Sequence, residues 1–319
     1  MISVVYHCYL VGNWKEIVNE QLNRLKSSGL YNSADIIEVT VNLDKTEKSE
    51  FENVVLNYPK LNVEYFTENA AEYPGIKKVR ELSLKHDTKI FYFHTKGVSN
   101  NYDNYNNKTI SQEKIENIKL WRECLEYFLI DKWNESVELL DSYDNVGVTC
   151  NGGWFWGNFW WSQSSHIRQT DEVGMWGRWD YEAWLNRSTP NSKNYEFYHF
   201  PYNPYVTKLD KELYTTKSKY IGDEIELIRA FYGTPPFQID EGYSGVDINV
   251  GDDVTDIVKK LLEIEDNIQF NFNINNESMG GDSAHGLRKF LIVEFSPKSD
   301  LNKIYKMGLH EGQTLTFKF

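Results

Sequence analysis

The chain has 319 residues, a hydrophobic content of 40% and a formal net charge of -13 at pH 7. This hydrophobic content allows a sizeable core and excludes wholesale disorder, and the length accommodates about two domains. The acidic balance argues against nucleic acid as a general partner, because phosphate binding requires a surface rich in lysine and arginine. A local basic pocket for a single nucleotide is compatible with it.

Targeting and membrane signals are not found in the sequence. No stretch approaches the roughly 18 to 20 apolar residues of a membrane span, and the N-terminus lacks the basic and apolar segments of a signal peptide. The three cysteines, Cys8, Cys124 and Cys150, are scattered without the paired spacing of a metal site. They are typical of small buried side chains in a reducing compartment, so we expect a cytoplasmic protein without a membrane span.

The first half of the chain alternates apolar runs with stretches of helical periodicity. Strands are expected at residues 2–10, 34–41, 61–65, 88–93 and 145–150. Helices are expected at residues 14–27, 49–56, 75–85 and 111–140. Repeated strand–helix units predict an α/β fold with a mostly parallel sheet flanked by helices on both faces.

The strand expected at residues 88–93 ends abruptly in four polar or small residues, His94, Thr95, Lys96 and Gly97. Ligands of open α/β sheets bind just beyond the carboxyl ends of the strands. An imidazole, a hydroxyl, an ammonium and a flexible glycine at that edge make a candidate anion site. A strand that ends in an ordinary polar turn explains the same residues equally well.

Two further residues are candidates because of their place in the predicted elements. His7 lies in the first strand, which also ends at the ligand edge, although such a histidine is more often satisfied in the core. Arg122 lies in the long helical stretch, where it either reaches a diphosphate or pairs with a carboxylate on the helix surface.

Aromatic residues make up 15% of the chain, and tryptophan is concentrated in one segment. Residues 151–163, NGGWFWGNFWWSQ, interleave glycines with bulky aromatic rings. Sugar rings present flat C–H faces that pack on aromatic rings, and their hydroxyls need carboxylates or amides nearby. The segment therefore fits a carbohydrate ligand, while core filling is the alternative explanation for the same tryptophans.

Two acidic residues, Asp180 and Glu182, lie among aromatic residues in the segment RWDYEAWL at 178–185. A carboxylate in such surroundings can have a raised pKa or act as a general base. The competing explanation is an ordinary first helical turn, where the helix dipole favours acidic residues.

The pattern changes near residue 220 to short β runs separated by Gly, Asn, Asp and Pro turns. Strands are expected at 226–232, 246–250, 268–274, 290–295 and 314–319, with one helix at 254–262. This predicts a small all-β, sandwich-like domain. We therefore expect one domain at residues 1–207, a linker at 208–219 and a β-rich accessory domain at 220–319.

Six motifs occur in order within residues 1–205: YHCYLVGNW, SGLY, FHTKG, WR in the long helix, GNFWW and YEAW. With them, this part of the chain resembles a bacterial and viral glycosyltransferase group related to the rhamnan synthesis proteins, which has a GT-A-like fold. The resemblance implies transfer of a hexosyl or deoxyhexosyl group from a nucleotide-sugar donor, a UDP- or dTDP-sugar, to a carbohydrate hydroxyl in polysaccharide or glycan synthesis.

The resemblance also implies how the donor is bound. The turn His94–Gly97 stands where the family keeps its acidic metal motif, and Mg²⁺ or Mn²⁺ would prefer carboxylate ligands. We therefore expect a metal-independent enzyme, with Mn²⁺ or Mg²⁺ left open. In it, Lys96, His94 and Arg122 stabilise the leaving diphosphate, and the first motif places His7 and Tyr9 at the nucleotide.

The remaining roles concern the acceptor and the proton. The family's glycine-bearing acceptor loop corresponds to Gly157 and Asn158, and its late histidine corresponds to His199. The base of an inverting enzyme corresponds to Glu182, or less well to Asp180; inversion is favoured and retention is left open. The expected sugar platform consists of Trp154, Trp156, Trp160 and Trp161.

A second resemblance covers residues 226–319. RAFYGT, DVTDIV, INNESMGGDSAHG and RKFLIVEF are similar to the C-terminal module of a J-domain cochaperone, although Ser283 stands where the usual pattern has a proline. A protein partner and a glycan partner are both open for this module.

Two other functions fit the same residues. A non-catalytic carbohydrate-binding protein would use the sheet as a scaffold and the β-rich domain as a lectin. A nucleotide-sugar hydrolase would release free sugar without an acceptor.

Overall fold

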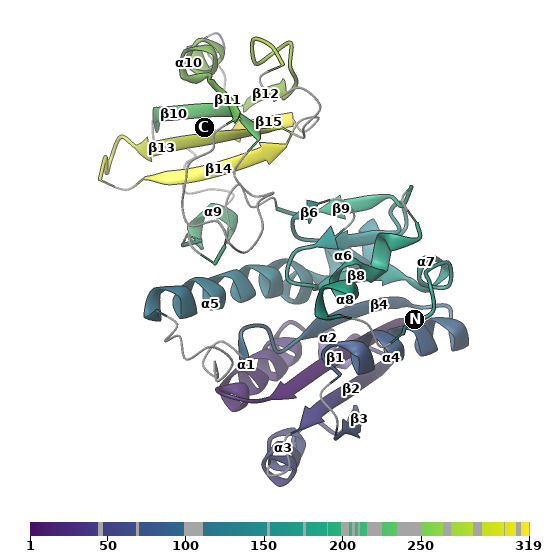
Figure 1. Ribbon diagram of the computed structural model, residues 1–319. Helices are drawn as coiled ribbons and strands as arrows, with labels where there is room; N and C mark the ends of the chain where they lie inside the picture. Colours follow the sequence, from purple (N-terminus) through teal and green to yellow (C-terminus); the bar gives the residue numbers. More distant parts are fainter. Residues whose placement is uncertain are drawn as a thin grey trace. The chain divides into compact units, whose positions relative to one another are not determined.

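The structure is a computed structural model that describes residues 1–43, 47–67, 70–98, 111–151, 154–174, 177–189, 191–198, 204–205, 208–209, 211–215, 225–234, 250–263, 269–282, 289–302, 304–310 and 314–318. The chain divides into two compact units, Met1–Tyr198 and His199–Phe319 (Figure 1). Within the described residues, no helix combines the length and the apolar character needed to cross a membrane.

The described part of the first unit is built on a seven-stranded sheet with the order β3-β2-β1-β4-β8-β5-β9. Its strands are β1 (Ile2–Leu10), β2 (Ile36–Leu43), β3 (Leu61–Phe66), β4 (Lys89–His94), β5 (Asn145–Gly147), β8 (Trp160–Gln163) and β9 (Asn194–Glu196). Neighbouring strands are parallel except at β8, which is antiparallel to both β4 and β5. The predicted mostly parallel α/β sheet is confirmed.

Helices lie between the strands of this sheet. They are α1 (Trp14–Ser27), α2 (Leu30–Ser33), α3 (Lys48–Val55), α4 (Tyr73–Lys85), α5 (Gln112–Glu126), α6 (Trp133–Leu139), α7 (Ser164–Ile167) and α8 (Arg178–Arg187). A two-stranded ribbon of β6 (Cys150–Asn151) and β7 (Trp154–Phe155) precedes β8.

The long helical stretch expected at residues 111–140 is observed, but as two α-helices rather than one continuous helix. A π-helical turn, η2 (Tyr127–Asp131), separates α5 from α6, and Lys132 leaves helical geometry at φ -104° and ψ 29°. Within η2 the carbonyl oxygen of Leu129 accepts a hydrogen bond of 2.9 Å from Trp161 Nε1. The interruption therefore gives a buried tryptophan its polar partner, which helical periodicity could not reveal.

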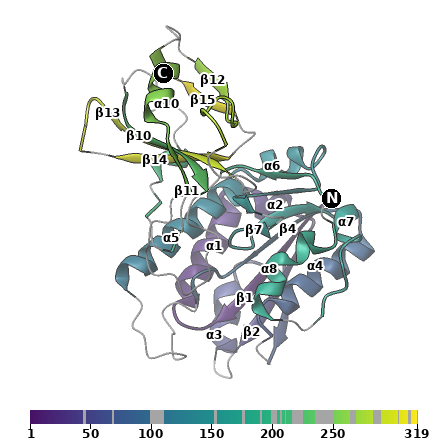
Figure 2. The same cartoon turned by 45° about the horizontal axis from the view of Figure 1, so that its top comes forward.

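The two faces of the sheet carry different layers, because alternate side chains of a strand point to opposite faces (Figure 2). On one face, α4, α7 and α8 pack on Val5, Ile90, Tyr92 and Trp160. On the other face, Tyr6 stacks on Phe93 and donates a hydrogen bond to Gln21 of α1. On the face that α4 covers, the apolar residues Val5 and Tyr92 are followed toward the carboxyl ends of the strands by His7 of β1 and His94 of β4.

The chain reverses its direction of travel across the sheet between β1 and β4. From β1 it proceeds outward to β2 and β3, and it then returns to add β4 on the opposite side of β1. Such a topological switch point leaves a crevice outside the carboxyl ends of the two strands, where ligands of open α/β sheets bind. The fold thus brings His7 of β1 level with His94 of β4.

The second unit is antiparallel where it is described. A four-stranded sheet has the order β11-β10-β13-β14, and β12 pairs with β15. Their bounds are β10 (Ile225–Thr234), β11 (Val250–Asp253), β12 (Gln269–Asn273), β13 (Phe290–Pro297), β14 (Tyr305–His310) and β15 (Thr314–Lys318), with helices α9 (Glu212–Thr215) and α10 (Thr255–Glu263). Val254 and Val258 at α10 pack into the core with Tyr232, Leu291 and Val293. The β-rich character of residues 220–319 and the helix expected at 254–262 are confirmed where this region is described, and the sandwich arrangement stays a prediction.

Candidate functional site

The turn that follows β4 is joined to β1 by two hydrogen bonds. The Thr95 amide donates to the carbonyl of His7 at 3.1 Å, and Thr95 Oγ1 accepts from the Tyr9 amide at 3.0 Å. Gly97 has a φ of 89°, a left-handed conformation that glycine adopts without strain. Thr95 is buried and shapes the turn, so the structure places its hydroxyl against the β1 backbone.

The side chain of Lys96 extends from this turn and is almost completely buried from solvent. Its side chain Nζ lies 4.1 Å from the ring centroid of Trp121 in α5, and the residue is only 6% exposed. A desolvated ammonium over an indole face is stabilised by a cation–π interaction. The low dielectric around it also strengthens its field at the strand edge.

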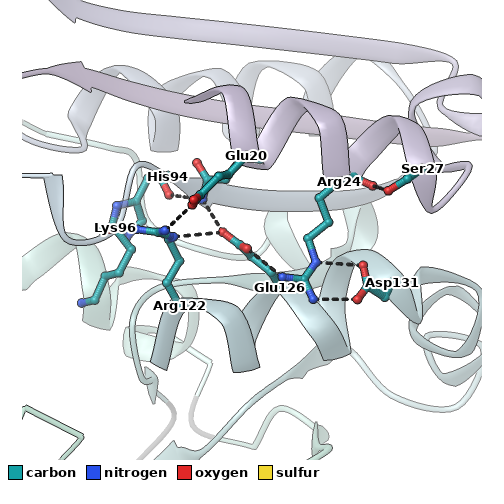
Figure 3. A network of polar contacts seen from close by, with 9 residues as sticks. Glu20, Arg24, Ser27, His94, Lys96, Arg122, Glu126 and Asp131 are labelled. Carbon is teal, nitrogen blue, oxygen red and sulfur yellow. Dashed lines mark hydrogen bonds and ion pairs between the residues drawn. The ribbon is translucent and has the colours of Figure 1, made fainter. Parts of the chain in front are cut away.

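Of the two roles that the sequence allowed for Arg122, the structure shows pairing with carboxylates. Its Nη2 lies 2.6 Å from Glu20 and its Nε lies 3.4 Å from Glu126, while Nη1 donates to the carbonyl of Lys96 at 3.3 Å (Figure 3). The residue is buried among these partners. The structure therefore places Arg122 as a support of the Lys96 turn, engaged by carboxylates, rather than as a direct contact of a diphosphate.

Around Arg122 lies a set of polar groups that joins α1 to α5, which we call the Glu126 network: the buried Gln21, Arg122 and Glu126, the partly buried Arg24 and the exposed Glu20. Glu126 accepts hydrogen bonds from Gln21 Nε2 at 2.8 Å and from Arg24 Nη1 at 3.0 Å. Burial raises the pKa of Glu126 above its ordinary value, although the two arginines act in the opposite direction.

On the other face of the sheet, four residues form what we call the Glu72 cluster: Glu72, Tyr92, His94 and Asn158. Glu72 immediately precedes α4 and is 9% exposed. Its Oε2 accepts hydrogen bonds from Tyr92 Oη at 2.8 Å and from Asn158 Nδ2 at 2.6 Å. Its Oε1 lies 3.9 Å from His94 Nε2. The cluster puts one carboxylate beside the last residue of β4.

Gly75 lets the start of α4 come close enough to build this cluster. A Cβ at this position would lie 2.8 Å from the ring of Tyr92 and 2.9 Å from Cβ of His7. Any larger residue would push the first turn of α4 away from β1 and β4, and Glu72 with it.

The charges at this edge are set by burial and by the neighbouring groups. Burial alone would raise the pKa of Glu72, but the fields of His94 and His7 and the hydrogen bonds from Tyr92 and Asn158 outweigh it and lower the pKa. Burial lowers the pKa of His7 to about 4. Burial and the charge of Glu72 raise the pKa of Tyr92 well above its ordinary value. At neutral pH, Glu72 is thus an anion and His7 a neutral imidazole.

The predicted acceptor loop lies against His94. The carbonyl of Gly157 is 2.9 Å from His94 Nε2, and Asn158 is buried with Oδ1 accepting from Trp160 Nε1 at 2.7 Å. Asn158 has a φ of 54°, which is unusual for a residue other than glycine. Ala71, which immediately precedes Glu72 in the chain, has a φ of 49°. Backbone strain of this kind clusters at functional sites.

The four tryptophans predicted as a sugar platform divide into two pairs. Trp160 and Trp161 are 1% and 0% exposed, with ring centroids 5.2 Å from Tyr92 and 5.0 Å from Phe91. They fill the core, as the alternative explanation held, and offer a sugar no accessible face. Trp154 is 41% exposed and Trp156 is half-buried, so this pair has ring surface at the protein exterior.

The two acidic candidates on α8 also separate. Asp180 Oδ2 accepts from the Gly177 amide at 3.0 Å, and Oδ1 pairs with Arg187 at 2.6 Å. These contacts belong to an ordinary helix start. Glu182 is half-buried, and its charge contributes to the raised pKa of Tyr92, which places it within electrostatic reach of the Glu72 cluster. His199 lies outside the described residues.

Glu72 was missed by the sequence interpretation. It lies three residues before the predicted start of a helix at residue 75 and directly before the observed α4, where an acidic residue is normally explained by the helix dipole alone. The nearby Gly75 inside the first turn was the signal that could have found it, since a glycine there indicates a close approach of helix and sheet. In the ranges that the structure describes, no group of three or more His, Cys, Asp or Glu side chains is arranged to hold a metal ion.

Comparisons with known proteins add little to this picture. No protein-family model matches the chain, and no curated protein sequence matches it. One solved structure that is similar is the crystal structure of 4-diphosphocytidyl-2C-methyl-D-erythritol synthase. It is 12% identical, the match covers 70% of this chain and 98% of that chain, and the TM-score is 0.32. A TM-score of this size carries no functional inference, so the two family resemblances stay predictions.

Proposed function

We propose that the unit Met1–Tyr198 is a glycosyltransferase that moves a sugar from a nucleotide-sugar donor to a carbohydrate hydroxyl. The observation that carries this proposal is the topological switch point between β1 and β4. The turn His94–Gly97 follows β4 at that point, and the loop of Gly157 and Asn158 is hydrogen-bonded to its first residue. The edge that the fold predisposes for a ligand therefore carries cationic groups that a sugar diphosphate requires, whereas the buried amide of Asn158 is bonded to Glu72 and Trp160.

The reaction would be a single displacement. The acceptor oxygen forms a bond to the anomeric carbon while the bond from that carbon to the diphosphate oxygen breaks, and the electron pair leaves with the nucleoside diphosphate. Glu182 takes the acceptor proton, and Lys96 and His94 stabilise the charge that develops on the diphosphate. Trp154 and Trp156 supply the exposed aromatic surface for a sugar ring. This route inverts the anomeric centre.

The same groups support a metal-independent enzyme. Both Glu72 Oε2 contacts are hydrogen bonds within its cluster, and the turn after β4 offers an ammonium and an imidazole instead of carboxylates. A Mg²⁺ or Mn²⁺ ion prefers oxygen ligands and would find few at this turn. Activity that disappears in excess chelator and returns with Mn²⁺ would overturn this part of the proposal.

The proposal is tested with the purified full chain. Thermal unfolding in a panel of UDP- and dTDP-sugars should identify a donor by a rise in midpoint, since a ligand that binds only the native state stabilises it. Release of nucleoside diphosphate should then depend on an added glycan acceptor. Sugar release without acceptor would indicate a hydrolase, and glycan binding without any nucleotide binding would indicate a carbohydrate-binding protein.

Replacing Lys96 by alanine should weaken binding of the nucleoside diphosphate. A charge-assisted hydrogen bond contributes about 1.5 to 3 kcal/mol, which corresponds to roughly a tenfold or greater rise in Kd. Isothermal titration with UDP and dTDP measures it. Lys132→Ala is the matched control, because Lys132 also lies over aromatic rings, those of Tyr127 and Phe128, but outside the proposed site. Equal affinity of wild type and Lys96→Ala would remove Lys96 from the donor site.

Replacing Glu182 by glutamine should stop transfer while leaving donor binding intact. Loss of a general base typically costs about 10²- to 10⁴-fold in rate, and the neutral amide preserves the shape of the side chain. Single-turnover transfer and donor titration separate the two effects. Asp180→Asn is the comparison variant; if it loses transfer and Glu182→Gln does not, the role of base belongs to Asp180.

A further inference from the structure

The pair formed by Glu72 and His94 has the geometry of a carboxylate that controls an imidazole. Glu72 Oε1 lies 3.9 Å from His94 Nε2, and the two side chains are only 12% and 14% exposed. An opposite charge within about 4 to 6 Å favours the charged form of a titratable group, and the effect grows as water is excluded. A buried carboxylate at this distance therefore favours the imidazolium form of His94 and acts against burial, which favours the neutral imidazole.

Both members of the pair are held in place by other groups. Tyr92 and Asn158 fix the carboxylate through one hydrogen bond each, and Asn158 is in turn bonded to Trp160. His94 Nε2 lies 2.9 Å from the carbonyl of Gly157, which can only accept a proton, so Nε2 carries one. The ring of His94 also packs edge-on against Phe159, with centroids 5.2 Å apart. The imidazole has one orientation at the end of β4.

The other titratable groups near His94 leave it as the positively charged partner of Glu72. From β1, His7 is neutral near pH 7, since burial lowers its pKa to about 4, and it is bonded to Thr40 Oγ1 at 2.9 Å. From α8, Glu182 adds a second negative charge in the neighbourhood of Tyr92. From α5, Arg122 is turned to Glu20 and Glu126.

We propose that Glu72 is a positioning residue that keeps His94 protonated and oriented toward the donor diphosphate. This inference rests on the proposed function of the β1–β4 edge. It assigns Glu72 no contact with substrate: its carboxylate acts through His94, as a fixed counter-charge. The cation at the diphosphate site would then consist of the Lys96 ammonium and of His94, which is charged because Glu72 is present.

The test is a titration of His94 in the full chain. Protein labelled with ¹⁵N in histidine is titrated by NMR, and the His94 signals are assigned by their loss in His94→Gln. Wild-type His94 should titrate above the ordinary midpoint of about 6.5. In Glu72→Gln the midpoint should move to lower pH. Glu81→Gln is the matched control, because it removes a more exposed carboxylate, paired with Lys78, from the helix that Glu72 precedes, and it should leave the midpoint unchanged.

Two results overturn the inference. One is a wild-type His94 midpoint at or below about 6.5, which needs no variant to fold. The other is the same midpoint in wild type and Glu72→Gln. Tyr92→Phe serves as the second variant, since it removes one hydrogen bond of the carboxylate but keeps its charge; it should leave the midpoint nearer to wild type than Glu72→Gln does.

Binding of UDP and dTDP as a function of pH separates this inference from the proposed function. Affinity should fall as pH rises through the His94 midpoint, and in Glu72→Gln this fall should occur at lower pH. If His94 titrates as expected but neither nucleotide nor nucleotide sugar binds, the proposed function fails and the pair of Glu72 and His94 stands. If nucleotides bind and the pH dependence is the same in both proteins, Glu72 does not act through His94.

Discussion

Two carboxylates are buried on opposite faces of the same sheet, and they differ in the kind of partner that they have. Glu126 is surrounded by Arg24, Arg122 and Gln21 at the packing of α1 on α5. Glu72 lies beside His94 where β4 ends. Burial raises the pKa of Glu126, whereas the surroundings of Glu72 overcome burial and lower its pKa. The comparison separates a carboxylate that connects helices from one placed at the ligand edge.

The difference follows from the chemistry of the partners. An arginine is charged at every working pH, so the Glu126 network has a fixed composition of charges and can only hold its geometry. A histidine changes its charge between about pH 5 and 8, so the pair of Glu72 and His94 can respond to a ligand or to pH. The Glu126 network nevertheless reaches the site, because Arg122 donates to the carbonyl of Lys96.

The largest expected effect is the loss of stability when Glu126 is replaced. Glu126→Gln should lower the free energy of unfolding by about 3 kcal/mol or more, because it removes the buried carboxylate that Arg24 and Arg122 share and leaves them with Asp131 and Glu20 as their remaining acidic partners. Urea unfolding at pH 7 measures the change. Glu135→Gln, which breaks an exposed pair with Lys132, should cost at most about 1 kcal/mol. A loss for Glu126→Gln as small as that of the control would mean that the network does not bear on folding.

The next largest effect is the dependence of the unfolding free energy on pH, which His7 controls through its lowered pKa. The pKa of His7 is about 4 in the folded protein and about 6.5 when unfolded, so the unfolded chain takes up the proton first on acidification. Stability from His7 is therefore complete above pH 6.5 and falls by about 3 kcal/mol as pH drops to about 4. His7→Gln should flatten this part of a plot of unfolding free energy against pH. Identical slopes in the two proteins would show that His7 is protonated in the native state and shares Glu72.

The sequence predicted the fold better than it predicted the roles of single residues. The first strand and α1 were placed at their observed bounds, Ile2–Leu10 and Trp14–Ser27, because apolar periodicity records which face is buried. The same signal cannot say what a buried residue contacts. Trp160 and Trp161 are therefore candidates for sugar binding by sequence alone, and only the structure shows that they pack in the core against Tyr92 and Phe91.

The contacts of the polar site residues could not be predicted from the sequence either. The turn after β4 was identified because a strand end at a sheet edge is a local feature. The role of Arg122 depends on Glu20, which is 102 residues away in the chain, and that of Glu72 depends on Asn158, which is 86 residues away. Such pairs are formed by the tertiary fold, and one sequence without its structure carries no record of them.

The smallest expected effect tests a residue that lies between the two carboxylates. Gly157 accepts from His94 on the Glu72 side, and a Cβ added to it would lie 2.7 Å from Leu125 and 3.2 Å from Trp121 on α5. Its φ of 82° matches the φ of 85° at Gly29, where an added Cβ meets nothing within 4 Å. Gly29→Ala should therefore lose about 1 kcal/mol of unfolding free energy from backbone strain alone. Gly157→Ala should lose this amount and, in addition, the cost of the clash between the new Cβ and Leu125 and Trp121. Gly157→Ala should be the less stable variant in urea and should also change the His94 NMR signals, while Gly29→Ala leaves them unchanged. Equal stability and unchanged His94 signals in both variants would mean that the loop before β8 yields without moving His94, and that the two carboxylates are not connected through Gly157.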